Sequence, residues 1–174
     1  HLNSYKNIFK KISPYLSGKT IVSDVGSAKE SVIASVEKFT QNKINFVPAH
    51  PIAGTEKSGP SAGFAELFEN RWCIITPLKN NISKDINIIK IFWKKLGSKV
   101  EIMTPSRHDR VMAITSHLPH LIAYNIVSTA ADLENITRSD VIKYSASGFR
   151  DFTRIASSDP TMWRDVFLSN KDAV

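Results

Sequence analysis

The sequence predicts a parallel α/β sheet domain followed by an all-helical domain. Short apolar strands alternate with helical segments as far as residue 104, and this alternation is typical of parallel sheets. Beyond Pro105 the pattern changes to one long helical register with no strong strand signal after it. We therefore expect a boundary at Thr104-Pro105, with residues 1–104 in the sheet domain and residues 105–174 in the helical domain.

The first part of the sheet domain is expected to contain two helices and one strand. The first helix is indicated by four apolar residues at helical spacing, namely Tyr5, Ile8, Phe9 and Ile12. Pro14 is expected to end or kink this helix. Residues 20–23 predict a short buried strand. Ser27 to Glu30 have the form of a capping box, which predicts a helix that begins there and runs to about Thr40.

The rest of the sheet domain is predicted from apolar runs that turn residues separate. Strands are expected over 44–47, 72–76 and 100–103, a short helix near 65–70 and a longer helix over 83–96. Pro48 and Pro51 are expected to stop the strand over 44–47, because proline lacks the N–H donor of the ladder. A loop rich in Gly, Ser and Pro follows over 54–63.

The helical domain is predicted from one long register over residues 106–133. Five of its apolar residues fall near one stripe: Val111, Ile114, Leu118, Leu121 and Ile126. Asp159 and Pro160 form a good N-cap and first-turn pair, and they predict a last helix that runs off the end of the chain.

The composition is typical of a globular protein, with 42% hydrophobic and 22% charged residues among 174. The formal net charge of +7 favours anionic partners. Because the lysines are scattered over the predicted helical faces, as on a solvated surface, we do not expect a nucleic-acid partner. Anionic small molecules would benefit from the same positive field.

Cysteine content and hydropathy favour the cytoplasm. Cys73 lies in an apolar run and is predicted to be a core residue, and a lone cysteine excludes a disulfide framework. No apolar stretch approaches the roughly 20 residues of a membrane span and no signal peptide is visible, so we expect no membrane partner. The chain begins at His1 without an initiator Met, which predicts a fragment.

Two loops follow predicted strands, and ligands of open α/β sheets bind at this place. In the loop over 24–29, Gly26 suits a turn and Ser27 suits a helix cap, while the Ser27 hydroxyl and backbone N–H groups could also face a ligand. In the loop over 50–59, His50 is well placed as a base, since histidine titrates near neutrality. The alternative is a histidine that is hydrogen-bonded within a turn.

The long predicted helix carries a polar face where a purely structural helix would be apolar. His117, His120 and Tyr124 share this face, and Pro119 lies between them. Proline inside a helix removes a backbone hydrogen bond, so the segment is either a shaped site or a kink that packing tolerates. We expect no metal site, because histidines three residues apart without an HExxH pattern or a cysteine pair are a weak zinc signal.

Two arginines and an aspartate lie close together over residues 148–154. Asp151 and Arg154 are three residues apart and could pair on a surface, which spacing alone favours. Alternatively, the planar fork of Arg154 could bind the carboxylate of a substrate with two hydrogen bonds.

Together these segments resemble the prephenate/arogenate dehydrogenase family. The matching motifs are Asp-Val-Gly-Ser-Ala-Lys (24–29), His-Pro-Ile-Ala-Gly-Thr-Glu-Lys-Ser-Gly (50–59), Ser-His-Leu-Pro-His (116–120), Gly-Phe-Arg-Asp-Phe-Thr-Arg-Ile-Ala (148–156) and Asp-Pro-Thr-Met-Trp-Arg-Asp (159–165). Each motif is weak alone, but the five occur in family order over nearly the whole chain. The resemblance implies a nucleotide-binding domain of Rossmann type followed by an all-α dimerisation domain, and therefore a homodimer.

The resemblance also implies roles for individual residues. By motif, His50 resembles the residue that accepts the proton of the ring C4 hydroxyl, and Ser27 resembles its partner beside the nicotinamide. Arg154 resembles the arginine that binds a substrate carboxylate, and His120 resembles a histidine of the same pocket. The remaining matches are supporting substrate positions: His117, Asp151 and Trp163.

The implied activity is the oxidative decarboxylation of prephenate to 4-hydroxyphenylpyruvate, with hydride transfer to NAD or NADP, in tyrosine biosynthesis. The alternatives are an arogenate dehydrogenase that gives tyrosine directly and a non-catalytic module that binds a cyclohexadienyl acid or tyrosine. A metal-dependent hydrolase is a third, weaker alternative. Retention of both Ser27 and His50 favours an enzyme, because a sensor does not need a base.

The sequence departs from the family in one respect. The early glycines are Gly18 and Gly26, and neither belongs to a G-x-G-x-x-G phosphate turn. We therefore expect a chain that starts after that half of the nucleotide-binding domain. We also expect it to end inside a helix, where the family's helical domain continues, so that residues 105–174 are an incomplete helical domain. Ser27 and Gly26 are expected to contact the cofactor on its nicotinamide side, the choice between NAD and NADP stays open, and this chain alone is expected to bind cofactor poorly.

Overall fold

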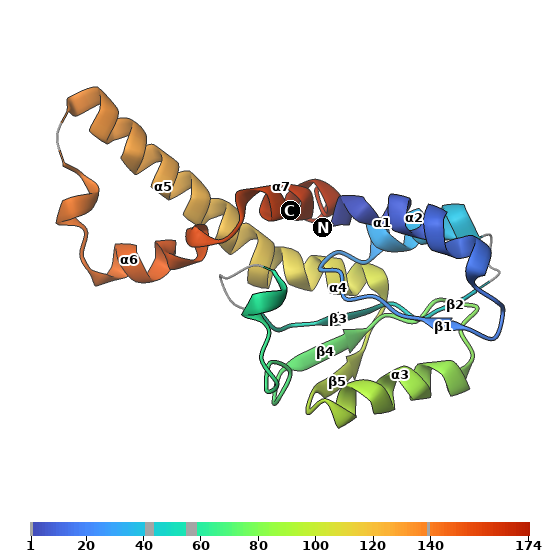
Figure 1. Ribbon diagram of the computed structural model, residues 1–174. Coiled ribbons are helices and arrows are strands. Elements are labelled where there is room, and N and C mark those ends of the chain that lie inside the picture. Colours follow the sequence, from blue (N-terminus) through green and yellow to red (C-terminus); the bar gives the residue numbers. More distant parts are fainter. Residues whose placement is uncertain (1, 41–43, 55–58, 139) are drawn as a thin grey trace.

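The structure is a computed structural model that describes residues 2–40, 44–54, 59–138 and 140–174. His1 and residues 55–58 of the second candidate loop lie outside the described residues. Figure 1 shows a sheet with helices on both faces, and a long helix that extends away from this body. Within the described residues, no helix is long and apolar enough to cross a membrane.

The described residues contain five short strands. These are β1 (Ile21–Val22), β2 (Asn45–Phe46), β3 (Ala49–Pro51), β4 (Trp72–Ile75) and β5 (Lys99–Ile102). They form a two-stranded sheet of β1 and β2 and a three-stranded sheet in the order β3-β4-β5. β1 pairs with β2 and β4 pairs with β5, both in parallel, whereas β3 pairs with β4 antiparallel. The four predicted strands are confirmed with small shifts of their bounds, but β3 and its antiparallel pairing were not predicted.

β2 ends before Pro48, as the sequence analysis expected, but the chain stays extended through Pro48 and enters β3. Val47 N–H donates to the Val22 carbonyl at 2.8 Å on one side, and Thr76 N–H donates to the Pro48 carbonyl at 2.9 Å on the other. Pro48 therefore acts only as an acceptor in the ladder, and its missing N–H costs nothing there. The segment around it passes from the β1 side to the β4 side and brings His50 into β3.

Helices cover both faces of the sheet. α1 (Tyr5–Ile12) and α2 (Glu30–Thr40) pack on one face, where Phe9 and Phe46 are in edge-to-face contact. α3 (Ser83–Lys95) packs on the other face against β4 and β5 (Figure 1). Cys73 lies in this second core, as predicted.

Two local predictions in this part are wrong. Residues 65–70 form successive turns rather than a helix, because Asn70 has a positive φ of 58° and its N–H donates to the Gly97 carbonyl. The predicted capping box at α2 is replaced by a distant carboxylate. Asp109 accepts hydrogen bonds from the backbone N–H groups of Lys29 and Glu30 at 2.8 and 2.9 Å.

The helical part begins with a long, nearly continuous helix. α4 (Pro105–Met112) is followed by a π-helical segment (Ala113–His117) and by α5 (Leu118–Thr137). The π-helical segment inserts extra backbone, so the predicted apolar stripe is not the buried face. Ile114 is 66% exposed, whereas Met112 and His117 are buried. Pro119 falls in the first turn of α5, where a missing N–H is tolerated.

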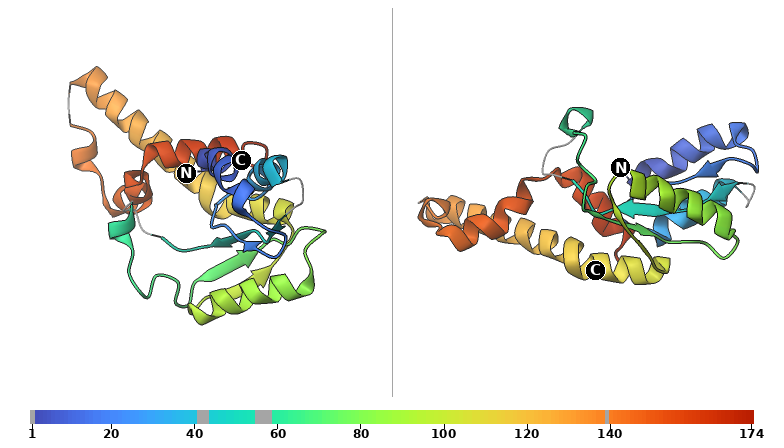
Figure 2. Two further views of the ribbon diagram at one scale, coloured as in Figure 1. Left: turned by 45° about the vertical axis from the view of Figure 1, so that its right-hand side comes forward. Right: turned by 90° about the horizontal axis from the view of Figure 1, so that it is seen from below.

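The remaining helices return from the tip of α5 to the body. α6 (Ser147–Thr153) and a short 3₁₀ turn (Arg154–Ser157) run back along α5, and α7 (Pro160–Ser169) lies beside the first residues of the chain. Two further views show the α5–α6 arm extending away from the sheet (Figure 2). Asp159 caps α7 as predicted, but α7 ends at Ser169 and does not run off the end, because a turn follows it.

Candidate active site

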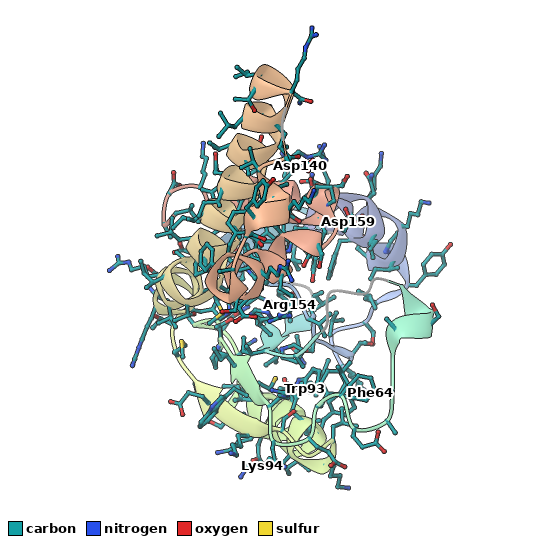
Figure 3. The ribbon with its side chains drawn as sticks, turned by 90° about the vertical axis from the view of Figure 1, so that its left-hand side faces the viewer. Phe64, Trp93, Lys94, Asp140, Arg154 and Asp159 are labelled. Carbon is teal, nitrogen blue, oxygen red and sulfur yellow. The ribbon has the colours of Figure 1, made fainter. Side chains whose placement is uncertain are left out.

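A pocket of about 470 Å³ lies where the sheet part meets the helical part. Five of the predicted site residues line it: Ser27, His50, His120, Arg154 and Trp163. The first two come from loops and strands of the sheet part, and the other three come from α5, the 3₁₀ turn and α7. In Figure 3, Arg154 lies between the helices of the arm and the sheet.

A buried ion pair ties the two sheet loops together. Lys29 is fully buried, and its Nζ donates to Asp24 Oδ2 at 2.6 Å and to the Ala49 carbonyl at 2.7 Å. Asp24 also accepts hydrogen bonds from the backbone N–H groups of Gly26 and Ala49. The loop that carries Ser27 and the strand that carries His50 are therefore held through the same two charged side chains.

Gly26 is required by close packing rather than by contact with the pocket. A Cβ at this position would lie 2.8 Å from the Tyr5 hydroxyl oxygen and 2.9 Å from Asp24 Oδ2. Tyr5 donates a hydrogen bond to the same Asp24 oxygen at 2.8 Å, so the space is already filled. Gly26 is not among the residues that line the pocket.

His50 is half-buried in β3 and lines the pocket. Its Nδ1 lies 2.8 Å from Nε2 of His108, which is buried on α4. Burial lowers the pKa of His50 well below 6.5, and electrostatic interactions with His108, Lys29 and His117 lower it further. His50 is therefore neutral at physiological pH, which is the state in which it can accept a proton.

His120 and Trp163 form one wall of the pocket. Their rings stack with centroids 3.6 Å apart, and His120 Nδ1 donates to the Ser116 carbonyl at 2.8 Å. Burial lowers the pKa of His120, although the bond to Ser116 opposes this. His120 therefore keeps a neutral ring with Nε2 as an acceptor. Trp163 Nε1 is buried and has no hydrogen-bond partner among the described residues.

Two of the predicted substrate residues do not reach the pocket. His117 is 1% exposed, and its Nδ1 lies 3.0 Å from the Asn170 amide nitrogen. Asp151 is exposed on α6. Neither of them lines the pocket, and nor does Gly26. The roles of all eight predicted site residues remain predictions.

Two family models match the chain, and together they cover almost all of it. The model described as "Prephenate dehydrogenase, nucleotide-binding domain" matches residues 2–102, and "Prephenate dehydrogenase, dimerization domain" matches residues 104–174. The chain belongs to the prephenate dehydrogenase family. The predicted family and the predicted fold class are confirmed.

Relatives and solved structures of the family are similar over nearly the whole chain. Cyclohexadienyl dehydrogenase from Zymomonas mobilis is 42% identical over 94% of this chain and 55% of its own length. Prephenate dehydrogenase from Bacillus subtilis is 38% identical over 88% of this chain and 41% of its own length. The chain therefore spans about half the length of the curated relatives that it matches.

A solved structure matches the fold and the sequence together. Prephenate dehydrogenase from Aquifex aeolicus, in complex with hydroxyphenyl propionate and NAD+, has a TM-score of 0.90 and 42% identity. The match covers 99% of this chain and 59% of the other. Arogenate dehydrogenase from Synechocystis has a TM-score of 0.78 and 25% identity, over 99% of this chain and 62% of its own.

Several residues that surround the pocket have no role in the sequence analysis. His108 and Asp109 lie behind His50, and Asn170 donates to the Asp109 carbonyl at 2.9 Å. Arg71 and Ser116 line the pocket. A signal for His108 and Asp109 existed, since they start the same helical register as His117. Their contacts with β3 and α2 could not be read from it.

Proposed function

We propose that this chain carries the substrate pocket of an enzyme that oxidatively decarboxylates prephenate to 4-hydroxyphenylpyruvate, with hydride transfer to NAD+ or NADP+. The observation that carries this proposal is one pocket lined by a neutral histidine and an arginine from the two parts of the chain. The names of the relatives and the hydroxyphenyl propionate and NAD+ in the Aquifex aeolicus structure support it.

The described residues fit only the nicotinamide side of a dinucleotide. Ser27 follows the carboxyl end of β1 and lines the pocket, and the side chain of Val25 in the same loop is 60% exposed. The sequence has no G-x-G-x-x-G turn for the phosphates. Bound NAD+ or NADP+ supplies the hydride acceptor for C4 of the substrate.

The protein residues then have three tasks. His50 accepts the proton of the C4 hydroxyl, with Ser27 as a hydrogen-bond partner of the same oxygen, while hydride leaves C4. The bond from C1 to its carboxylate breaks, CO2 departs, and its electron pair completes the aromatic ring, whose oxygen takes the proton back to give the phenol. Arg154 binds a carboxylate of the substrate, and the stacked rings of His120 and Trp163 offer a flat wall to the substrate ring.

We propose further that residues 1–104 are the C-terminal half of a nucleotide-binding domain of Rossmann type and that residues 105–174 belong to a helical domain through which two copies associate. The name of the second family model supports this assembly. So do the large apolar side chains exposed along the arm: Ile122, Ile126, Leu133, Ile136, Tyr144 and Phe152.

Ligand binding tests the pocket without requiring turnover. Hydroxyphenyl propionate, titrated calorimetrically into the chain, should bind, and Arg154→Gln should weaken binding by about 10- to 100-fold, because a charge-assisted hydrogen bond contributes about 1.5–3 kcal/mol. Arg150→Gln is the matched control, since Arg150 is exposed on α6 and does not line the pocket. Equal effects of the two substitutions would remove Arg154 from the proposed role.

Turnover is tested in the whole protein that contains this chain. Prephenate and arogenate are each assayed with NAD+ and NADP+, which also decides between the two acids. His50→Gln should abolish most turnover and keep ligand affinity within a few-fold, because the proton acceptor is lost while the carboxylate contact remains. A wild-type protein that binds either acid without oxidising it would instead be a sensor.

A further inference from the structure

Behind the pocket, His50 is the outer member of a chain of three side chains. Its Nδ1 lies 2.8 Å from His108 Nε2, and His108 Nδ1 lies 2.7 Å from Asp109 Oδ1. His108 and Asp109 are 0% and 1% exposed, so water does not compete for these bonds. A bond to each nitrogen of His108 fixes its ring, and His50 has its Nδ1 committed to the interior.

Asp109 determines which atom of each hydrogen bond in this chain of side chains carries the proton. Asp109 accepts backbone N–H groups of Lys29 and Glu30 at the start of α2. Burial alone would raise the pKa of Asp109, but the bonds from His108, Glu30 and Lys29 outweigh it and lower the pKa, so the group is a carboxylate and only accepts. The proton between Asp109 and His108 is therefore on His108 Nδ1.

The tautomer of His108 determines whether His50 Nδ1 donates or accepts. The negative charge of Asp109 is shared with two backbone N–H donors at the α2 N-terminus, and the Lys29 ammonium lies in the same buried cluster. A neutral His108 that carries its proton on Nδ1 presents a lone pair at Nε2. His50 must then donate its own Nδ1–H to that lone pair, which leaves Nε2 of His50 without a proton.

We propose that His108 and Asp109 are positioning residues that hold His50 in the Nδ1–H tautomer, so that Nε2 is the proton acceptor of the pocket. This inference rests on the proposed function, in which His50 is the base. The anchor is fixed from three elements: Asp109 is on α4, caps α2, and accepts a hydrogen bond from Asn170, just after α7, at its carbonyl. Asp109, which sets the tautomer of His50, thus also joins the sheet part of the chain to the helical part.

The tautomer is measured directly by NMR of the chain labelled with ¹⁵N in its histidine rings. The His50 signals are those that are missing in His50→Gln. We expect the Nδ1–H form of His50 in the wild-type chain. Asp109→Asn leaves one amide oxygen for the three N–H donors that the carboxylate accepts. Where the amide NH₂ turns to His108 Nδ1, the tautomers of both histidines reverse, so the Nε2–H form of His50 should appear. His108→Gln should keep the Nδ1–H form, because its amide oxygen still accepts from His50.

The kinetic consequence is measured in the whole protein that contains this chain. Asp109→Asn should lower kcat by about 10²- to 10⁴-fold, the usual contribution of a general base, with KM for the substrate nearly unchanged. His108→Gln should lower kcat by only about tenfold, as for one weakened hydrogen bond. Asp165→Asn is the control, since Asp165 is equally buried but pairs with Arg164 instead.

The outcomes separate this inference from the proposed function. An Nε2–H tautomer of His50 in the wild-type chain overturns the inference, and this measurement holds even if Asp109→Asn does not fold. If the tautomer reverses while kcat of the whole protein stays the same, the inference stands and the role of His50 as a base is wrong.

Discussion

The Asp24 carboxylate holds together the segments that carry the pocket residues Ser27 and His50. It accepts hydrogen bonds from Tyr5, Gly26, Lys29 and Ala49, and with Lys29 it forms a fully buried ion pair. Removing one partner of such a pair leaves an uncompensated buried charge. Through these bonds the pair fixes the loop that carries Ser27 against the strand that carries His50.

The pH dependence of turnover should show the environment of His50. Its pKa lies well below 6.5, chiefly through burial, so the base stays neutral on both sides of neutrality. We expect kcat of the whole protein to be level from about pH 8 to 6 and to fall only at more acid pH, where the imidazole gains a proton. An acid limb centred near 6.5 would show an ordinary histidine; return to pH 7.5 controls for unfolding.

At the scale of elements, the π-helical segment Ala113–His117 decides which side chains meet the pocket. One widened turn rotates the helix that follows, so that His117 is buried toward Asn170 while Ser116 and His120 line the pocket. Such segments are frequent at functional sites. A uniform helical register cannot reproduce this arrangement, and Ile114 of the predicted apolar stripe is 66% exposed.

The cap of α7 should contribute measurably to stability. Asp159 Oδ1 accepts the backbone N–H groups of Thr161 and Met162 at 2.8 and 3.2 Å. Asp159→Ala should lower the free energy of unfolding by about 1 kcal/mol, because those donors lose their partner. Asp172→Ala, an exposed aspartate with no such cap, should change it by less than about 0.5 kcal/mol in the same denaturant titration. If Asp159→Ala left the free energy of unfolding unchanged, the first turn of α7 would be frayed in solution.

At the scale of the molecule, the pocket exists only because the helical part folds back on the sheet part. The sheet part contributes Ser27 and His50, and the helical part contributes His120, Arg154 and Trp163. Their junction is filled with titratable groups, of which His108, Asp109 and His117 are nearly inaccessible to water. The stability of this junction should therefore depend on pH.

His117 should make the folded chain less stable at acid pH. Burial lowers its pKa to about 4, so an unfolded chain binds a proton there near pH 6.5 while the folded chain does not. The contribution of neutral, buried His117 to the free energy of unfolding is complete above pH 6.5. It is lost as the pH falls towards 4, by roughly 3 kcal/mol in all. Urea titrations of the wild type and His117→Gln across this range measure it. Parallel pH profiles for the two chains would contradict the assignment to His117.

The sequence by itself determined the elements and the family of this protein. Apolar runs and helical spacings are local, so four strands and the main helices could be predicted to within a few residues. The motifs around Ser27, His50, His120 and Arg154 carried the resemblance that the family models confirmed. All four line one pocket, since they sit at strand ends and helix turns that a family fold places together.

Only the tertiary structure decided the contacts between distant residues. The capping of α2 by Asp109, the bond from His108 to His50 and the contact of Asn170 with His117 join residues 53 to 80 positions apart. β3 pairs antiparallel with β4, next to the bond that the Thr76 N–H donates to the Pro48 carbonyl. The π-helical segment packs against α7. No local pattern encodes such contacts, because their free energy comes from burying polar groups of separate segments against one another.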